Sequence, residues 1–146
     1  MAELRRELAA RGAAEVRTHL QSGNAVLVAD ADPTPLVVEA VAALGVRCEV
    51  VVRTAAELAD VVGRCPWPGR AAAEPALLHV GFLSAAAEVR VRGTGPDEEV
   101  RVDGREVWTW YGAGAGRSRL ALDAPGAVLT ARNWRTVTAL AALAGG

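Results

Sequence analysis

Apolar residues in the first third of the chain recur with two different periods. Two leucines four positions apart, flanked by charged residues and followed by Gly12, predict an amphipathic helix over residues 2–11. Apolar and polar residues alternate over residues 16–20, a Gly-Asn turn follows, and a second apolar run covers residues 25–29. This pattern predicts a β-hairpin directly after the first helix.

A second helix and another strand are predicted next. The segment Asp-Pro-Thr-Pro gives a helix start signal, helical periodicity covers residues 36–44, and Gly45 ends it. Residues 46–52 are then apolar and β-branched, as in a strand. The order helix, strand, strand, helix, strand is that of a split βαββαβ unit without its first strand. Residues 1–65 therefore predict an incomplete unit of this type.

The rest of the chain predicts a second half that echoes the first. Thr54 and Glu57 have the spacing of a capping box for a helix, which the rigid segment at residues 65–69 ends. A buried strand is predicted over residues 77–83, whereas residues 85–92 fit a helix and a strand equally well.

The second half is predicted to continue with a hairpin and a helix. Residues 100–102 and 107–111 form the hairpin across Asp103-Gly104, a type I′ signal, residues 127–131 are extended, and the final helix runs from Asn133 to about Ala144. We expect an α+β fold with mostly antiparallel sheets, in which residues 66–146 and residues 1–65 form one compact domain.

Composition limits the classes of function. Apolar residues make up 51% of the 146 positions, which is enough for a globular core. The 16 basic and 17 acidic side chains give a net charge of -1, so nucleic acid is disfavoured as a partner because no positive field attracts its phosphates. Every basic residue is arginine, which excludes Schiff-base chemistry and a Walker-type phosphate loop.

Cysteine spacing and hydropathy predict a cytoplasmic protein without metal, cofactor or membrane association. Cys48 and Cys65 do not form a CxxC pair, so neither a zinc ribbon nor a thioredoxin motif is present. The first residues are charged, and no apolar run approaches the roughly 18 residues of a membrane span.

Hydrogen-bond donors concentrate just before the last predicted helix. Asn133 can cap that helix, which would bring Arg132, Arg135 and the positive end of the helix dipole toward one point where an anion could bind. The alternative is an ordinary helix cap beside a solvated or paired arginine. Trp134 fits the apolar stripe of the helix and is predicted to lie in the core.

A second donor-rich segment covers residues 112–119. Its alternating glycines, including Gly116, would let backbone amides wrap an anion, and Arg117 and Ser118 add a guanidinium and a hydroxyl. The spacing differs from that of a dinucleotide fingerprint. The alternative is a flexible strand exit in which these side chains pair locally with Asp123.

Polar side chains also gather at the apex of the first predicted hairpin. Gln21, Ser22 and Asn24 could contact a ligand there, although a tight turn alone favours serine, glycine and asparagine. Together with the two arginine-bearing segments they make up the predicted ligand-binding set: Gln21, Ser22, Asn24, Gly116, Arg117, Ser118, Arg132 and Asn133.

Candidate catalytic residues are few. His79 and Ser118 are the weak candidates for a base and a nucleophile, but His79 alternates with apolar residues in a strand and also fits a hydrogen-bonded core histidine. No GxSxG elbow is present. Trp108 and Trp110 share one face of a strand and form either a core wall or a stacking platform for single-stranded nucleic acid.

Five segments together resemble the bacterial domain of unknown function 1697 family: residues 16–24 (VRTHLQSGN), 51–54 (VVRT), 79–83 (HVGFL), 116–118 (GRS) and 132–137 (RNWRTV). The resemblance implies a cytosolic α+β protein of two ferredoxin-like halves, and the family implies no particular reaction. Family members open with a strand before the helix that Met1-Ala2-Glu3-Leu4 begins, so this chain is expected to be an N-terminally truncated member.

The sequence thus favours a protein that binds a small anionic molecule, with an enzymatic role left open. The alternatives are a single-stranded nucleic-acid binder that uses sheet-surface tryptophans, and an interaction module that borrows a strand from a partner. Without a first strand the sheet would expose an edge, through which a homo-oligomer could also form.

Overall fold

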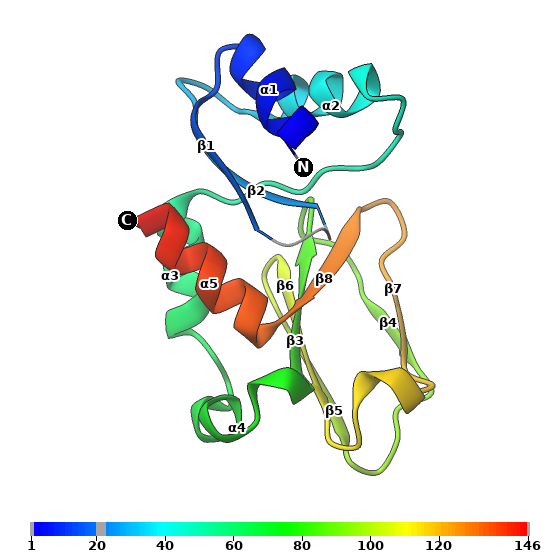
Figure 1. Ribbon diagram of the computed structural model, residues 1–146. Coiled ribbons are helices and arrows are strands. Elements are labelled where there is room, and N and C mark those ends of the chain that lie inside the picture. The colour runs from blue at the N-terminus through cyan, green and yellow to red at the C-terminus, as the bar shows by residue number, and fades with distance from the viewer. Residues whose placement is uncertain (1, 20–22, 146) are drawn as a thin grey trace.

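The structure, a computed structural model, describes residues 2–19 and 23–145. The predicted helix, hairpin and helix of the first half are confirmed as α1 (Ala2–Ala10), β1 (Ala14–His19), β2 (Asn24–Val28) and α2 (Thr34–Ala43) (Figure 1). Both helices pack on the hairpin through a small apolar cluster of Leu8, Ala13 and Ala40, to which Leu4, Val16, Leu27, Leu36 and Val37 contribute.

The predicted strand at residues 46–52 is wrong. These residues form no helix or strand, although their composition is that of a strand. β2 pairs only with β1, and no described strand lies beside residues 46–52. A strand exists only through its hydrogen bonds to a neighbour, so a suitable sequence without one remains irregular.

The helix that follows begins as predicted. α3 (Ala55–Gly63) has a complete capping box, in which the Thr54 side chain accepts from the Glu57 amide and the Glu57 side chain accepts from the Thr54 amide. A short helix α4 (Pro68–Ala73) and the turn η1 (Pro75–Leu77) then lead into the main sheet.

The main sheet has four antiparallel strands in the order β5-β6-β3-β8. They are β3 (Leu78–Leu83), β5 (Glu98–Asp103), β6 (Glu106–Tyr111) and β8 (Leu129–Asn133). The β5–β6 hairpin is confirmed, but its turn is not type I′. The two residues between the paired Asp103 and Glu106 are Gly104 and Arg105, and of these only Gly104 has a positive φ.

The two long connections of the second half contain short strands. The undecided segment at residues 85–92 forms only β4 (Arg90–Arg92), and this strand pairs with β7 (Ala121–Asp123) in a two-stranded ribbon. The turn η2 (Ala115–Arg117) lies between β6 and β7, and the final helix is α5 (Trp134–Gly145). Figure 1 shows the ribbon and the α3–α5 pair on opposite sides of the main sheet.

The main sheet buries both of its faces. Leu78, Val80 and Trp108 point toward α3 and α5, where they pack with Leu58, Val61, Ala71, Phe82, Trp134 and Val137. Leu83 and Val107 point the other way and pack with Ala124 and with partly buried residues of the ribbon. Alternate residues of each strand therefore belong to different cores.

Gly81 lies at the centre of this sheet, paired with Val107 on one side and Ala131 on the other. A Cβ atom at this position would lie 2.8 Å from Cδ1 of Leu129, so the leucine occupies the space that a side chain would need.

The α+β class with antiparallel sheets is confirmed, whereas the ferredoxin-like halves are not. The second half has the strand order of a split βαββαβ unit, with its first strand β3 between its third strand β6 and its last strand β8. However, the ribbon stands where the two crossover helices would be, and the described residues of the first half form only a hairpin.

Candidate functional site

Asn24 and Arg132 meet where the β1–β2 hairpin contacts the main sheet. Arg132 Nε donates to Asn24 Oδ1 at 2.8 Å, and Arg132 Nη1 donates to Thr130 Oγ1 at 3.0 Å and to the Ala131 carbonyl at 2.8 Å. Asn24 is buried, and its Nδ2 donates to the His19 carbonyl at 3.0 Å. The asparagine therefore joins the turn end of the hairpin to a guanidinium on β8, 108 residues further along the chain.

The predicted cap of the last helix is present. Asn133 Oδ1 accepts from the Thr136 amide at 3.0 Å, as expected for an N-cap residue. Arg135 is exposed on the first turn of α5, whereas Trp134 is buried against Trp108, with ring centroids 5.7 Å apart. The core position predicted for Trp134 is confirmed.

The glycine-rich segment is tied to β5 instead. The Ser118 hydroxyl donates to Glu98 Oε2 and accepts from the Leu120 amide, and Glu98 Oε1 accepts from the Gly95 amide. Arg117 and Gly116 are exposed in η2. These local hydrogen bonds resemble the alternative prediction, in which the segment is a strand exit with locally paired side chains. However, Ser118 pairs with Glu98 and not with Asp123.

The structure does not bring the two arginine-bearing segments together. Ser118 contacts β5, while Arg132 lies on β8 at the opposite edge of the sheet, about 14 Å away across three strand spacings. The faces also differ, because Arg132 pairs with Val80 of the helix-side core, whereas Glu98 lies two residues from Val100 of the ribbon-side core. Gln21 and Ser22 lie outside the described residues, so the structure describes only the Asn24 part of the hairpin apex.

His79 and Ser118, the two candidate catalytic residues, lie near the same end of the sheet. The rings of His79 and Tyr111 are 5.0 Å apart in an edge-to-face arrangement. Tyr111 pairs with Glu98, to which Ser118 donates. Burial lowers the pKa of His79 below its usual value despite a backbone hydrogen bond to Ala76 that opposes the shift, so the ring favours the neutral state.

Burial raises the pKa of Tyr111, and the negative charge of Glu98 adds to this shift. The Ser118 hydroxyl is directed to a carboxylate rather than to His79, and so these contacts do not form a serine–histidine pair. A catalytic role for either residue stays a prediction.

A network of arginines and carboxylates joins α3 to the turn of the β5–β6 hairpin. Glu106 is 4% exposed and binds Arg53 and Arg64 through its two oxygens, and Arg64 also pairs with Asp60 and Asp103. Arg53 donates in addition to the carbonyls of Leu83 and Arg105. These charges line a groove of about 340 Å³, but they neutralise one another, which is typical of a structural junction.

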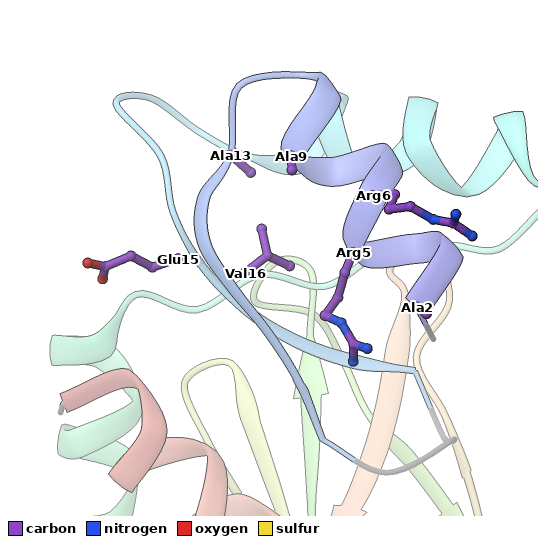
Figure 2. Close-up of a pocket in the computed structure, with 7 residues that line it drawn as sticks. All are labelled: Ala2, Arg5, Arg6, Ala9, Ala13, Glu15 and Val16. Carbon is purple, nitrogen blue, oxygen red and sulfur yellow. The ribbon is translucent and has the colours of Figure 1, made fainter.

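A larger groove of about 580 Å³ lies between α1 and β1 (Figure 2). It is open to solvent and is lined by Ala2, Arg5, Arg6, Ala9, Ala13, Glu15 and Val16. Arg5 points toward the strand and donates to Thr18 Oγ1 at 2.8 Å, while Arg6 points away from it. No local sequence pattern predicts this groove, because its shape depends on how α1 packs across the hairpin.

The predicted alternative that Trp108 and Trp110 form a stacking platform for bases is wrong. Trp108 is 0% exposed in the helix-side core, and Trp110 is half-buried beneath the guanidinium of Arg70, 5.4 Å from its ring centroid. A stacking surface for bases needs exposed ring faces, so the core-wall alternative holds for Trp108.

Neither a metal cluster nor a membrane-spanning helix occurs in the described residues. No group of three histidine, cysteine or carboxylate side chains could hold an ion there. Within the same residues no helix is long and apolar enough to cross a bilayer.

The fold and the Asn24–Arg132 contact together define a small α+β protein. In it, an amino-terminal hairpin is joined to an antiparallel sheet through this asparagine–arginine pair. The chain belongs to the family described as Protein of unknown function (DUF1697), whose model matches residues 1–108. The matched range includes Asn24 but ends before Gly116 and Arg132. No match was found among curated proteins or among solved structures.

Proposed function

We propose that this protein binds a small anionic molecule beside the Asn24–Arg132 pair, with the Arg132 guanidinium as the main contact. The observation that supports the proposal is the way this guanidinium is held. Its hydrogen bonds to Asn24, Thr130 and the Ala131 carbonyl fix the orientation of the planar group before any ligand arrives. A pre-oriented guanidinium loses less conformational entropy when it binds a carboxylate or phosphate.

These three acceptors are uncharged, which distinguishes Arg132 from the arginines of the α3 junction. Arg53 and Arg64 are paired with carboxylates that cancel their charge. Asn24, Thr130 and a backbone carbonyl carry no charge, so these three hydrogen bonds orient the arginine and do not themselves neutralise it. The positive charge of a half-buried arginine attracts an anion more strongly than that of a fully solvated one.

The proposed site is smaller than the set predicted from the sequence. Gly116, Arg117 and Ser118 lie at the other edge of the sheet and are not part of it. His79 pairs with Asn133 but points to the opposite face from Arg132, so the proposal covers binding and no reaction.

Thermal unfolding with inorganic phosphate or citrate tests the proposal. At fixed ionic strength, set with sodium chloride, millimolar concentrations of at least one of these anions should raise the Tm by a few degrees, because a ligand that binds only the folded state stabilises it. Arg132→Gln should abolish this rise, whereas Arg132→Lys should retain a smaller part of it.

Arg117→Gln is the matched control, since it removes the same charge at an exposed position outside the site. It should leave the anion-dependent rise unchanged. The proposal fails if neither anion raises the Tm of the unaltered protein, or if the folded Arg132→Gln variant responds as strongly as Arg117→Gln does.

A further inference from the structure

The groove between α1 and β1 is formed by a face of α1 that does not contribute to the core. Its helix wall consists of four exposed residues with the spacing i, i+3, i+4 and i+7, which places them on one face: Ala2, Arg5, Arg6 and Ala9. The apolar cluster of the first half instead takes Leu4 and Leu8 from this helix. The face with the two arginines is therefore open to solvent.

This groove and the Arg132 site lie on opposite faces of the β1–β2 hairpin. Thr18 pairs with Ala25. The next residue, His19, pairs with Asn24. Successive side chains of a strand point to opposite faces, so the Thr18 side chain is on the α1 side and the Asn24 side chain is on the other side. The groove is therefore separate from the site proposed above.

The Arg5 guanidinium is held in position at this groove. Its side chain points from α1 toward the hairpin (Figure 2), and its Nη1 donates to Thr18 Oγ1 at 2.8 Å. Its Nε and Nη2 make no hydrogen bond within residues 2–19 and 23–145. These two nitrogens form one edge of the planar group, and such an edge can donate to both oxygens of a carboxylate.

The positive charge at this groove is not paired with a carboxylate. Among the residues that the structure describes, neither Arg5 nor Arg6 forms an ion pair. Thr18, which accepts from Arg5, is uncharged. Glu15 is the acidic residue that lines the groove, and its side chain points away from α1 (Figure 2). An anion beside Arg5 therefore meets a guanidinium whose charge no bonded partner neutralises.

The rest of the groove is apolar. Alanine and valine supply four of the residues that line it: Ala2, Ala9, Ala13 and Val16. Their side chains are short, and the groove has a volume of about 580 Å³, which is within the usual range for small-molecule sites. Apolar surface beside a guanidinium complements a ligand that has an apolar body and one anionic group.

We infer that this groove binds an aliphatic monocarboxylate. The carboxylate binds Nε and Nη2 of Arg5 through its two oxygens. The alkyl chain lies along the apolar residues that line the groove: Ala9, Ala13 and Val16. A single negative charge matches the single guanidinium that points to the hairpin, because Arg6 points away from it (Figure 2). This binding is independent of the anion site proposed above.

Titration of the full chain with acetate, butyrate, hexanoate and octanoate tests this inference, with the amide chemical shifts of residues 2–18 as the readout. All solutions have the same pH and ionic strength, and octanoate is kept below the concentration at which it forms micelles. Affinity should rise about two- to fourfold for each added methylene, because each one buries further apolar surface. Equal affinities for acetate and octanoate, or no octanoate binding, would overturn the inference.

Charge removal tests the contact to the carboxylate. Arg5→Gln should weaken octanoate binding about tenfold or more, since it removes the charged donor of two hydrogen bonds. Arg17→Gln is the matched control, because Arg17 is exposed on β1 but faces the opposite side of the hairpin from Thr18. This control should bind octanoate as the unaltered protein does. Equal affinities of the two variants would contradict the inference.

Filling the groove tests the position of the alkyl chain. Ala9→Phe should remove most of the dependence on chain length, whereas Ala10→Phe, at an exposed position of α1 outside the groove, should retain it. The same dependence in both variants would show that the chain lies elsewhere. Arg132→Gln should leave octanoate binding unchanged. A loss of binding in that variant would place the carboxylate at the Arg132 site and so reject the groove as its site.

Discussion

Glu106 is the most buried carboxylate in the contact between α3 and the β5–β6 turn. Its side chain is 5% exposed, and its two oxygens bind two arginines, one of which is 6% exposed. Removing the charge of Glu106 leaves Arg53 buried without a counter-charge. The free-energy cost of this unpaired buried charge exceeds the net stabilisation that the intact pair provides.

We predict that Glu106→Gln lowers the free energy of unfolding by about 3–5 kcal/mol, measured by urea denaturation. Glu99→Gln is the matched control, because Glu99 forms an exposed pair with Arg70 and its removal should cost about 1 kcal/mol or less. Similar losses in the two variants would show that Arg53 finds another partner or becomes hydrated.

Sequence identified individual residues of the site but not their neighbours. Dense hydrogen-bond donors and acceptors in the sequence indicate Asn24, Arg132 and Asn133 as site residues, and the capping role of Asn133 follows from local spacing alone. The Asn24–Arg132 bond joins residues 108 positions apart, and no local pattern encodes such a contact. For the same reason the sequence predicts Ser118 and Arg132 at one site, although the strand order puts them at opposite edges.

At the scale of single elements, the capping box at the start of α3 also takes part in a contact with the main sheet. Thr54 and Glu57 complete the capping box, and the second oxygen of Glu57 also binds Arg105 of the β5–β6 turn. The amide of Thr54 is the main cause of the lowered pKa of Glu57, and Arg105 contributes to it.

Thr54→Ala should lower the free energy of unfolding by about 0.5–2 kcal/mol, because the Glu57 amide loses its acceptor. Thermal or urea unfolding measures this loss. Thr94→Ala, at an exposed position in the loop after β4, should change stability by no more than about 0.5 kcal/mol. A loss in Thr54→Ala no larger than this would mean that water replaces the hydroxyl.

Helices were easier to predict than strands. α1, α2, α3 and α5 have caps, prolines or glycines at their ends and apolar stripes between them, all of which are local in sequence. The strand predicted at residues 46–52 fails because pairing depends on a distant partner. β4 and β7 have three residues each, too few for an alternation pattern, and Pro68-Gly69 at the start of α4 resembles a turn.

The whole molecule has cores of unequal size. Among the described residues, the helix-side core of the main sheet contains nine buried residues, including two tryptophans, whereas the first half has a buried cluster of three, two of which are alanine. Apolar burial is the main source of stability, so the first half is the weaker part.

Hydrogen exchange under native conditions should therefore separate the two parts. Amides of β1, β2 and α1 should exchange through openings of lower free energy than those of β3 and β6, which are held between two packed faces. Mass spectrometry of peptides from each part measures the difference. Identical opening free energies would show that the chain unfolds as one cooperative unit.

The packing at Gly81 couples the residue types that positions 81 and 129 can accept. Leu129 on the edge strand β8 fills the volume above this glycine of the central strand β3, 2.8 Å from where a Cβ would lie. An alanine at position 81 therefore requires the Leu129 side chain to change its rotamer or to be replaced by a smaller one. Among relatives that share this sheet, an alanine at position 81 should therefore occur more often beside a side chain smaller than leucine at position 129 than beside leucine itself.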